Sequence, residues 1–175
     1  MSDSTAAFSA THIGQKLIKA IPMTRQEYND FRGWALPENE LSLGNDGGYM
    51  VEYEPNKTSI PNVEGFQGYI SWSPKAVFDD AYKSLDAMSF GDAITMLKRG
   101  EKVARKGWNG KGMFLILVQA DDYCYKQKLI DAVQPNSADS PAQLPFIAMK
   151  TSDNCFVPWL ASQTDVLSED WVIAS

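Results

Sequence analysis

The sequence of 175 residues is poor in the side chains that most enzyme active sites need. It contains one histidine, His12, and two cysteines, Cys124 and Cys155, which lie far apart without CxxC spacing. Catalytic triads, Cys–His pairs and His-based metal sites all require a well-placed imidazole, and His12 lies in a Ser/Thr/Ala-rich leader. We therefore predict no catalytic residue, no metal ligand, no cofactor and no disulfide, and we expect both cysteines in the core.

Long hydrophobic runs and an excess of positive charge are also absent. No apolar stretch approaches the roughly 20 residues that span a bilayer, and the first residues lack the basic-then-apolar order of a signal peptide. The net charge of −6 disfavours binding to nucleic acid polymers or to anionic membranes. These features indicate an intracellular protein, and a hydrophobic content of 44% is sufficient for a core.

The balance of charge changes near residues 84–88. Residues 1–87 contain seven basic and twelve acidic side chains, whereas the rest of the chain is almost neutral. We therefore predict a flexible leader over residues 1–12, a small acidic α+β accessory domain over 13–87 and a second domain over 88–175.

The first of these domains carries strong helix signals but no chemical motif. A capping box at Thr24–Glu27 predicts a helix up to about Arg32 with Gly33 as its stop, and Ser73–Pro74 predicts the start of another helix. Residues 37–46 are expected to form a loop, and residues 48–53 and 68–72 to form strands. The aromatic residues are interpreted as core more readily than as a binding face; they are Trp34, Tyr49, Tyr53, Tyr69 and Trp72.

The second domain is predicted to be one helix packed on a small antiparallel sheet, so the fold class is α+β. A capping box at Ser89–Asp92 begins the helix, which ends at Gly100. Strands are expected over residues 101–105, 113–118, 146–149, 156–159 and 170–173, with a helical turn at 163–167. Asn109–Gly110 predicts a two-residue hairpin turn, residues 152–154 a second hairpin, and residues 121–141 a polar loop with or without a short helix.

The stretch RKGWNGKGMF, from Arg105 to Phe114, combines glycines and basic residues with aromatic ones. It does not fit a P-loop, because the glycines are too closely spaced and Gly112 follows Lys111 where a Ser or Thr is required. Aromatic rings can stack on nucleobases, and basic side chains and glycine amides can hold phosphates. The alternative, that the lysines coat a helix end and the tryptophans fill the core, remains open.

Four blocks of sequence in the second domain resemble the Thoeris anti-defence protein 2 family of phages and prophages. In order they are SFG-x-A, R-x-GWNGKG-x-F, PW-x-x-S-x-x-D and a closing DW, and together they cover about residues 88–173. The resemblance implies a non-catalytic sponge that binds glycocyclic ADP-ribose signals of bacterial TIR-domain immune proteins, with cyclic dinucleotides as a further ligand class in some relatives. It also implies a homotetramer with ligand pockets at subunit contacts, acting in the cytoplasm of the infected bacterium.

Block matching carries the family's binding positions onto this sequence. It implies that Phe90, Trp108 and Asn109 stack on and recognise a base, with Arg105 close to phosphate. A second set of candidates comes from the later blocks: Trp159, Ser162, Asp165 and Asp170. Trp171 is as consistent with the core as with a ligand wall.

Three functions therefore stay open. The first is capture of a cyclic nucleotide signal by residues 88–175. The second is hydrolysis of such a signal, for which Asp165 and Asp170 are the placed acid/base candidates. The third is a protein-binding accessory role for residues 1–87.

Overall fold

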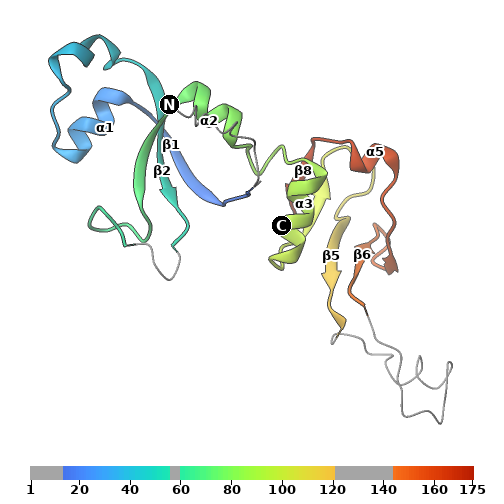
Figure 1. Cartoon of the computed structure of the whole chain (residues 1–175). Coiled ribbons are helices and arrows are strands. Elements are labelled where there is room, and N and C mark those ends of the chain that lie inside the picture. The colour runs from blue at the N-terminus through green and yellow to red at the C-terminus, as the bar shows by residue number, and fades with distance from the viewer. Residues whose placement is uncertain (1–13, 56–59, 121–143) are drawn as a thin grey trace, which may run out of the picture. The chain divides into compact units, whose positions relative to one another are not determined.

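The computed structural model of the chain is shown in Figure 1 and describes residues 14–55, 60–120 and 144–175. The chain divides into two compact units, unit 1 (Met1–Tyr82) and unit 2 (Lys83–Ser175). Each unit combines an antiparallel sheet with short helices, which confirms the predicted α+β fold class. Within the described ranges, no helix is long and apolar enough to cross a membrane.

Unit 1 is built on a three-stranded antiparallel sheet in the order β1 (Ile18–Thr24), β2 (Gly47–Tyr53) and β3 (Ile70–Pro74). On one face, Tyr28 of helix α1 (Arg25–Arg32) packs with Met50 and Ile70 in the core. On the other face, Phe78 of helix α2 (Lys75–Ala81) stacks on Tyr49 with ring centroids 4.0 Å apart. The sheet is therefore covered on both sides by helices of its own unit.

The predicted limits of α1 are confirmed. The Thr24 hydroxyl accepts from the Glu27 amide and the Glu27 carboxylate accepts from the Thr24 amide, so the capping box is complete. Gly33 ends the helix in the left-handed conformation, with a φ of 68°. Only glycine adopts this conformation without strain, which explains why the helix stops there.

Three expectations for unit 1 were wrong in detail. The helix after β3 begins at Lys75, and its N-cap is Pro74 without a side-chain cap, whereas Ser73 pairs with Tyr49 in the sheet. A 3₁₀ helix, η1 (Glu38–Leu43), lies within the segment expected to be a loop. Strand β1 was not predicted, because its exposed edge contains Pro22 and lacks the alternation of a half-buried strand.

The aromatic side chains of unit 1 divide between core and surface. Trp72 packs against the core cluster, as predicted, and its indole N–H donates to the Met23 carbonyl at 2.9 Å. Trp34 and Tyr69 are 52% and 49% exposed, which contradicts their assignment to the core. The Arg32 guanidinium covers the Trp34 ring at 4.1 Å from its centroid.

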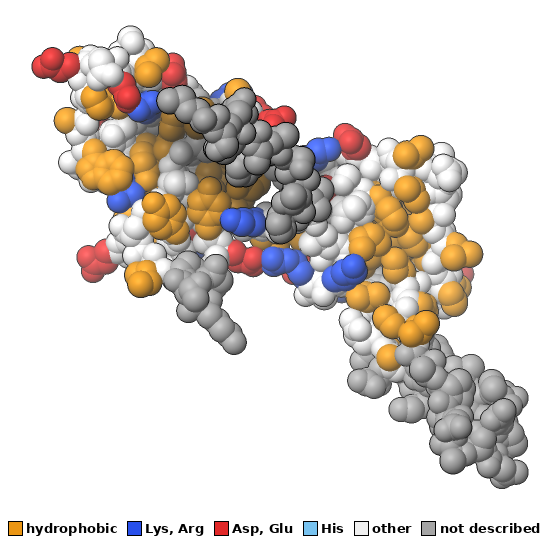
Figure 2. Space-filling view, in the orientation of Figure 1, with side chains coloured by type: hydrophobic (Ala, Val, Ile, Leu, Met, Phe, Trp, Pro, Cys, Tyr) orange, Lys and Arg blue, Asp and Glu red, His pale blue; other side chains and the backbone are white. Residues whose placement is uncertain are grey.

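Unit 2 is a five-stranded antiparallel sheet in the order β7-β6-β5-β4-β8. The strands are β4 (Val103–Arg105), β5 (Phe114–Val118), β6 (Phe146–Lys150), β7 (Phe156–Pro158) and β8 (Trp171–Ile173). Helix α3 (Phe90–Lys98) packs on β8, β4 and β5, and a short helix α5 (Gln163–Val166) precedes β8. This confirms the prediction of one helix packed on an antiparallel sheet, and hydrophobic side chains gather beside α3 in Figure 2.

A reciprocal pair of backbone hydrogen bonds joins the two ends of the unit 2 fold. The Met88 amide donates to the Trp171 carbonyl at 2.9 Å, and the Trp171 amide donates to the Met88 carbonyl at 3.1 Å. Both side chains are almost completely buried. The segment that leads into α3 is thereby fixed to the last strand of the sheet.

Two further expectations for unit 2 were wrong. Asn109–Gly110 is not a two-residue turn, because β4 ends at Arg105, β5 begins at Phe114, and only Gly112 within this connection has a positive φ. Cys155 is exposed rather than buried. The hairpin at residues 152–154 is confirmed by the pairing of Lys150 with Phe156. His12, Cys124 and the predicted loop 121–141 lie outside the described residues.

Candidate functional site

Four aromatic rings, the aromatic cluster, meet on the face of the unit 2 sheet that carries α3. The ring centroid of Trp171 lies 5.5 Å from that of Phe90, 5.6 Å from that of Trp108 and 6.1 Å from that of Trp159. Trp159 also lies 6.2 Å from Phe90 and 6.4 Å from Trp108. Trp171 is 0% exposed and belongs to the core, whereas the other three rings are half-buried and keep part of their surface accessible.

Separate elements of the fold bring these rings together. Phe90 is the first residue of α3, whose start is fixed by the predicted Ser89–Asp92 capping box. Trp159 follows β7, and its amide donates to the Ile147 carbonyl in β6 at 2.9 Å. Trp171 lies opposite Arg105 in the β4–β8 pair, and Trp108 follows β4 by three residues. The cluster therefore depends on the tertiary fold and not on any one segment.

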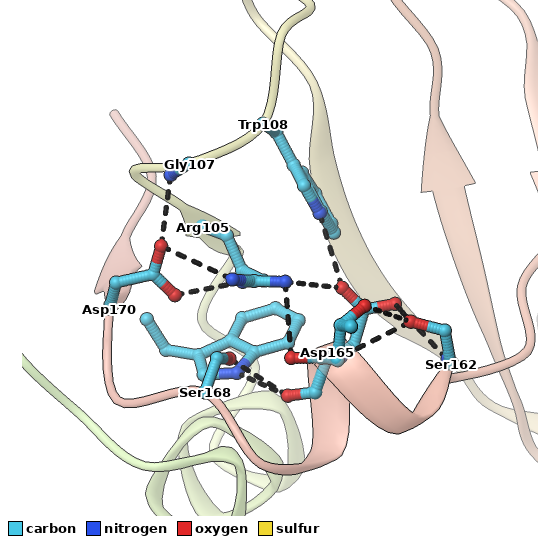
Figure 3. Close-up of polar contacts among 9 residues, drawn as sticks. Arg105, Gly107, Trp108, Ser162, Asp165, Ser168 and Asp170 are labelled. Carbon is cyan, nitrogen blue, oxygen red and sulfur yellow. Dashed lines mark hydrogen bonds and ion pairs between the residues drawn. The ribbon is translucent and has the colours of Figure 1, made fainter.

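Arg105 is the centre of a polar network next to the aromatic cluster (Figure 3). Its Nε donates to Asp170 Oδ1 at 2.8 Å and its Nη1 donates to Asp165 Oδ1 at 2.9 Å. Nη1 also donates to the Thr164 carbonyl at 3.3 Å. Arg105 thus connects β4 to α5 and to the residue before β8, and we call Arg105, Asp165 and Asp170 the carboxylate–arginine clamp.

The clamp extends to the backbone and ring of the loop that carries Trp108. Asp170 Oδ2 accepts from the Gly107 amide at 3.0 Å, and Asp165 Oδ1 accepts from the Trp108 indole N–H at 3.4 Å. A Cβ atom at Gly107 would lie 2.9 Å from Asp170 Oδ2, so a larger residue at this position would disturb the contact. The loop is therefore tied to the clamp immediately before Trp108 and again through its indole.

The other Asp165 oxygen belongs to the cap of α5. Oδ2 accepts from the Ser162 amide at 3.1 Å and from the Ser162 hydroxyl at 2.6 Å. The backbone carbonyl of Asp165 accepts from the Trp171 indole N–H at 3.1 Å and from the Ser168 hydroxyl at 2.8 Å. Asp165 is the one buried charged residue in the described parts of the chain, and these contacts satisfy its oxygens.

The charges of the clamp stabilise one another. Hydrogen bonds to Asp170 and then to Asp165 raise the pKa of Arg105. The hydrogen bond from Arg105 lowers the pKa of Asp170 despite an opposing effect of burial. Burial acts to raise the pKa of Asp165, but hydrogen bonds from Ser162, Arg105 and Trp108 outweigh it, and the pKa is lowered. Both carboxylates therefore remain ionised at neutral pH.

The eight sequence-predicted site residues fall into three groups. Phe90, Trp108 and Trp159 come together in the aromatic cluster. Arg105, Ser162, Asp165 and Asp170 come together in the clamp and the cap of α5. Asn109 is exposed on the loop, and no described residue forms a hydrogen bond with its side chain. Arg105, expected close to phosphate, has a carboxylate partner on two sides.

Sequence reasoning missed the groups that support this site. The Gly107 amide, the Thr164 carbonyl and the Ser168 hydroxyl all take part through backbone or short side-chain contacts. A glycine directly before Trp108 was the one available signal, since glycine allows close approach to another group. The partner of that glycine, Asp170, could not be identified without the pairing of β4 with β8.

The site offers stacking surfaces, but its carboxylates and the amides of Gly107 and Trp108 are occupied. Ring faces can receive a planar group, and the exposed Lys106 and Lys111 flank the Trp108 loop. Among the described residues, no group of three or more His, Cys, Asp and Glu side chains could hold a metal ion. The arrangement therefore presents ring faces beside two exposed lysines.

Comparison with known proteins gives two matches. The sequence profile of the "Thoeris anti-defense 2-like domain" matches residues 88–174, which include the whole aromatic cluster and the clamp. The protein "Thoeris anti-defense 2" of Bacillus phage SP01 is 42% identical over 94 residues, a match that covers 50% of this chain and 96% of that relative. The profile match lies within unit 2.

Proposed function

The chain belongs to the Thoeris anti-defence 2-like family, and we propose that it is a phage anti-defence protein that captures a nucleotide immune signal. The proposed ligand is a glycocyclic ADP-ribose, with cyclic dinucleotides as a further class. Capture in the cytoplasm of the infected bacterium would keep the host effector inactive without cleavage of the signal. Residues 88–175 would form the binding domain.

The aromatic cluster is the observation that carries this proposal. Three half-buried rings surround a fully buried tryptophan, next to a loop held by the clamp. A base stacked on an aromatic ring gains about 1 to 3 kcal/mol, and nanomolar affinity requires about 12 kcal/mol. We propose that Phe90, Trp108 and Trp159 supply stacking, that Asn109 reads a base edge, and that phosphate contacts supply the rest.

Positive charge for those phosphates is available on the loop itself. Lys106 and Lys111 are exposed, and neither ammonium group has a hydrogen bond or ion pair to another described residue. Arg105 carries one positive charge between two carboxylates, so the clamp as a whole is negative. We propose that Arg105 acts near the phosphates by holding the loop, while the lysines contact them.

The state of the carboxylates supports capture in preference to hydrolysis. A general acid or base needs a free oxygen and a pKa near neutrality. Asp165 and Asp170 accept several hydrogen bonds each, and the pKa of both is lowered, because Arg105 and neighbouring donors stabilise the charged form. Neither carboxylate is suited to donate a proton at neutral pH.

We propose that the protein forms a homo-oligomer, a tetramer as the family resemblance implies, and the second face of the unit 2 sheet supports a contact between copies. Phe114, Ile116 and Val118 alternate with the buried Leu115 and are directed away from the face that carries α3. On the same side, Phe156 is 59% exposed, with its ring centroid 6.3 Å from that of Phe114. An antiparallel sheet that faces water normally carries polar residues there, so this apolar face favours contact with a second copy.

The test is release of the ligand from the denatured protein. The protein is incubated with glycocyclic ADP-ribose, separated from free ligand, heated, and the supernatant is analysed by mass spectrometry. Recovery of one intact ligand per site supports capture. Recovery of a cleaved product, with several turnovers per protein molecule, would establish the hydrolase instead. Size-exclusion chromatography with light scattering gives the number of subunits.

One observation in unit 1 favours a second role, as a protein-binding accessory module. Trp34 is 52% exposed under the Arg32 guanidinium, and Phe31 beside it is 43% exposed. Tryptophan and arginine are the residues most enriched at the energetic centres of protein interfaces. Unchanged ligand capture by a Trp34→Ala variant would show that this surface is not required for capture, and loss of capture would argue against a separate role.

A further inference from the structure

We infer that Asp165 is a positioning residue that sets the orientation of the Trp108 ring, through which it controls ligand affinity. The effect on affinity rests on the proposed function. The orientation of the Trp108 ring can be measured on the ligand-free protein and does not depend on the proposed function. This role differs from direct ligand contact, which the sequence pattern suggested for Asp165.

The two oxygens of the Asp165 carboxylate point to different parts of the fold. Oδ2 receives the Ser162 amide and hydroxyl at 3.1 and 2.6 Å, which fixes the carboxylate to the start of α5. Oδ1 receives Arg105 Nη1 at 2.9 Å and the Trp108 indole N–H at 3.4 Å. The helix cap thus holds the carboxylate still, while its second oxygen defines where the indole N–H must point.

The loop backbone is held by the same clamp. Arg105 also donates to Asp170, whose Oδ2 accepts from the Gly107 amide at 3.0 Å. The Trp108 amide donates to the Arg105 carbonyl at 3.3 Å. The Cα position of Trp108 is therefore set through Asp170 and Arg105, and the contact to Asp165 sets the rotation of the ring about its side-chain bonds (Figure 3).

A second capping box in the same unit has the same geometry. Asp92 receives the Ser89 amide at 3.0 Å and the Ser89 hydroxyl at 2.6 Å, almost the same distances as in the Ser162–Asp165 box. Asp165 also accepts hydrogen bonds from the Arg105 guanidinium and from the Trp108 indole, which lie about sixty residues away in sequence. Helix capping does not need those contacts, so they indicate a separate role for Asp165.

Burial argues that Asp165 acts through Trp108 rather than by touching the ligand. Asp165 is 9% exposed, and its oxygens already accept four hydrogen bonds from protein groups. Trp108 is half-buried and can present a ring face outward. A ring held in one rotamer loses less entropy when a base stacks on it, which increases affinity without a new contact.

The first experiment follows the indole N–H signals of the five tryptophans by ¹⁵N-TROSY spectroscopy of the ligand-free protein. In Asp165→Asn we expect the Trp108 signal to move, while the Trp34 and Trp72 signals of unit 1 keep their wild-type positions. Asp92→Asn is the matched control and should leave the Trp108 signal in place. An unmoved Trp108 signal in Asp165→Asn would overturn the inference.

The second experiment is a double-mutant cycle measured by calorimetry with glycocyclic ADP-ribose. Trp108→Phe keeps an aromatic face and removes the N–H that Asp165 binds. We expect Asp165→Asn to weaken binding about tenfold in the wild-type background and less than about twofold in the Trp108→Phe background. Equal weakening in both backgrounds would mean that Asp165 acts by a route other than the Trp108 indole, through the ligand or through Arg105, and would overturn the inference.

The outcomes separate this inference from the proposed function. If the wild-type protein does not bind glycocyclic ADP-ribose, the proposed ligand is wrong, and the indole signals still decide whether Asp165 orients Trp108. If Asp165→Asn does not fold, Ser162→Ala removes one support of the carboxylate and should move the Trp108 signal in a folded protein. The absence of that movement would refute the positioning role.

Discussion

Replacement of Arg105 by methionine should destabilise unit 2 by about 2 to 3 kcal/mol at pH 7. Removing one partner of a fully buried ion pair costs about 3 to 5 kcal/mol, whereas an exposed pair contributes about 0 to 1 kcal/mol. The side chains of Arg105, Asp165 and Asp170 are 17%, 13% and 32% exposed, which places the clamp between these limits. Methionine fills a similar volume, so most of the loss comes from the two carboxylates left without a cation.

The measurement is hydrogen–deuterium exchange by mass spectrometry across a urea series, because it reports the two units separately. Peptides that contain β5 should lose protection at lower urea in Arg105→Met, whereas peptides from β2 should not change. Arg105→Lys is the matched variant, because it keeps the charge but cannot bridge both carboxylates in the same geometry. Its stability should lie between that of the wild type and that of Arg105→Met. A change below about 0.5 kcal/mol in Arg105→Met would refute the view that the clamp stabilises the fold.

The pH dependence gives a second check on the same variant. The folded-state pKa of Asp165 and of Asp170 is lowered, so their stabilising contribution is present above the unfolded pKa of about 3.9 and is lost as pH falls through the lower folded value. Arg105→Met removes most of this contribution. The stability gap to wild type should therefore be largest at pH 7 and should close in strong acid, and a gap that widened on acidification would contradict the assignment.

The remaining predictions concern ligand capture and the core of unit 1. Trp108→Ala should abolish capture, and unchanged circular dichroism would show that the fold is intact; unchanged affinity would remove Trp108 from the site. Combined Lys106→Ala and Lys111→Ala substitutions should weaken capture at least tenfold, with a shallower salt dependence, whereas arginine at both positions should retain most of it. Gly48→Ala should destabilise unit 1 by about 1 to 3 kcal/mol in urea melts, because its Cβ would collide with the Trp72 ring.

Local signals in the sequence predicted most helices and strands of both units. The predicted capping boxes at Thr24 and Ser89 are complete in the structure, because they depend on residues only three positions apart. The predicted start of α2 was wrong by one residue, since Pro74 and not Ser73 is the N-cap. Strand β1 was not predicted, because it is defined by its pairing with β2 and not by a local pattern. Local patterns were sufficient where local contacts decide, and insufficient where strand pairing does.

The candidate site shows the same division. Block matching selected Arg105 in one set of candidates and Asp165 and Asp170 in another, and the structure brings all three into one clamp. Their chemistry was less predictable, because an arginine beside glycines is equally consistent with phosphate binding and with an internal ion pair. The pairing of β4 with β8 decides between these, since it places Arg105 opposite Trp171 and next to Asp170.

The reciprocal hydrogen bonds between Met88 and Trp171 have a consequence for how this fold can be used. They place the first and last residues of the folded unit next to each other, so a foreign domain joined at either end would not distort the sheet. Unit 2 should therefore tolerate new chain connections at its ends. We expect it to accept circular permutation, with a short linker after Ser175 leading to Met88 and new ends in the exposed hairpin at Ser152–Asn154.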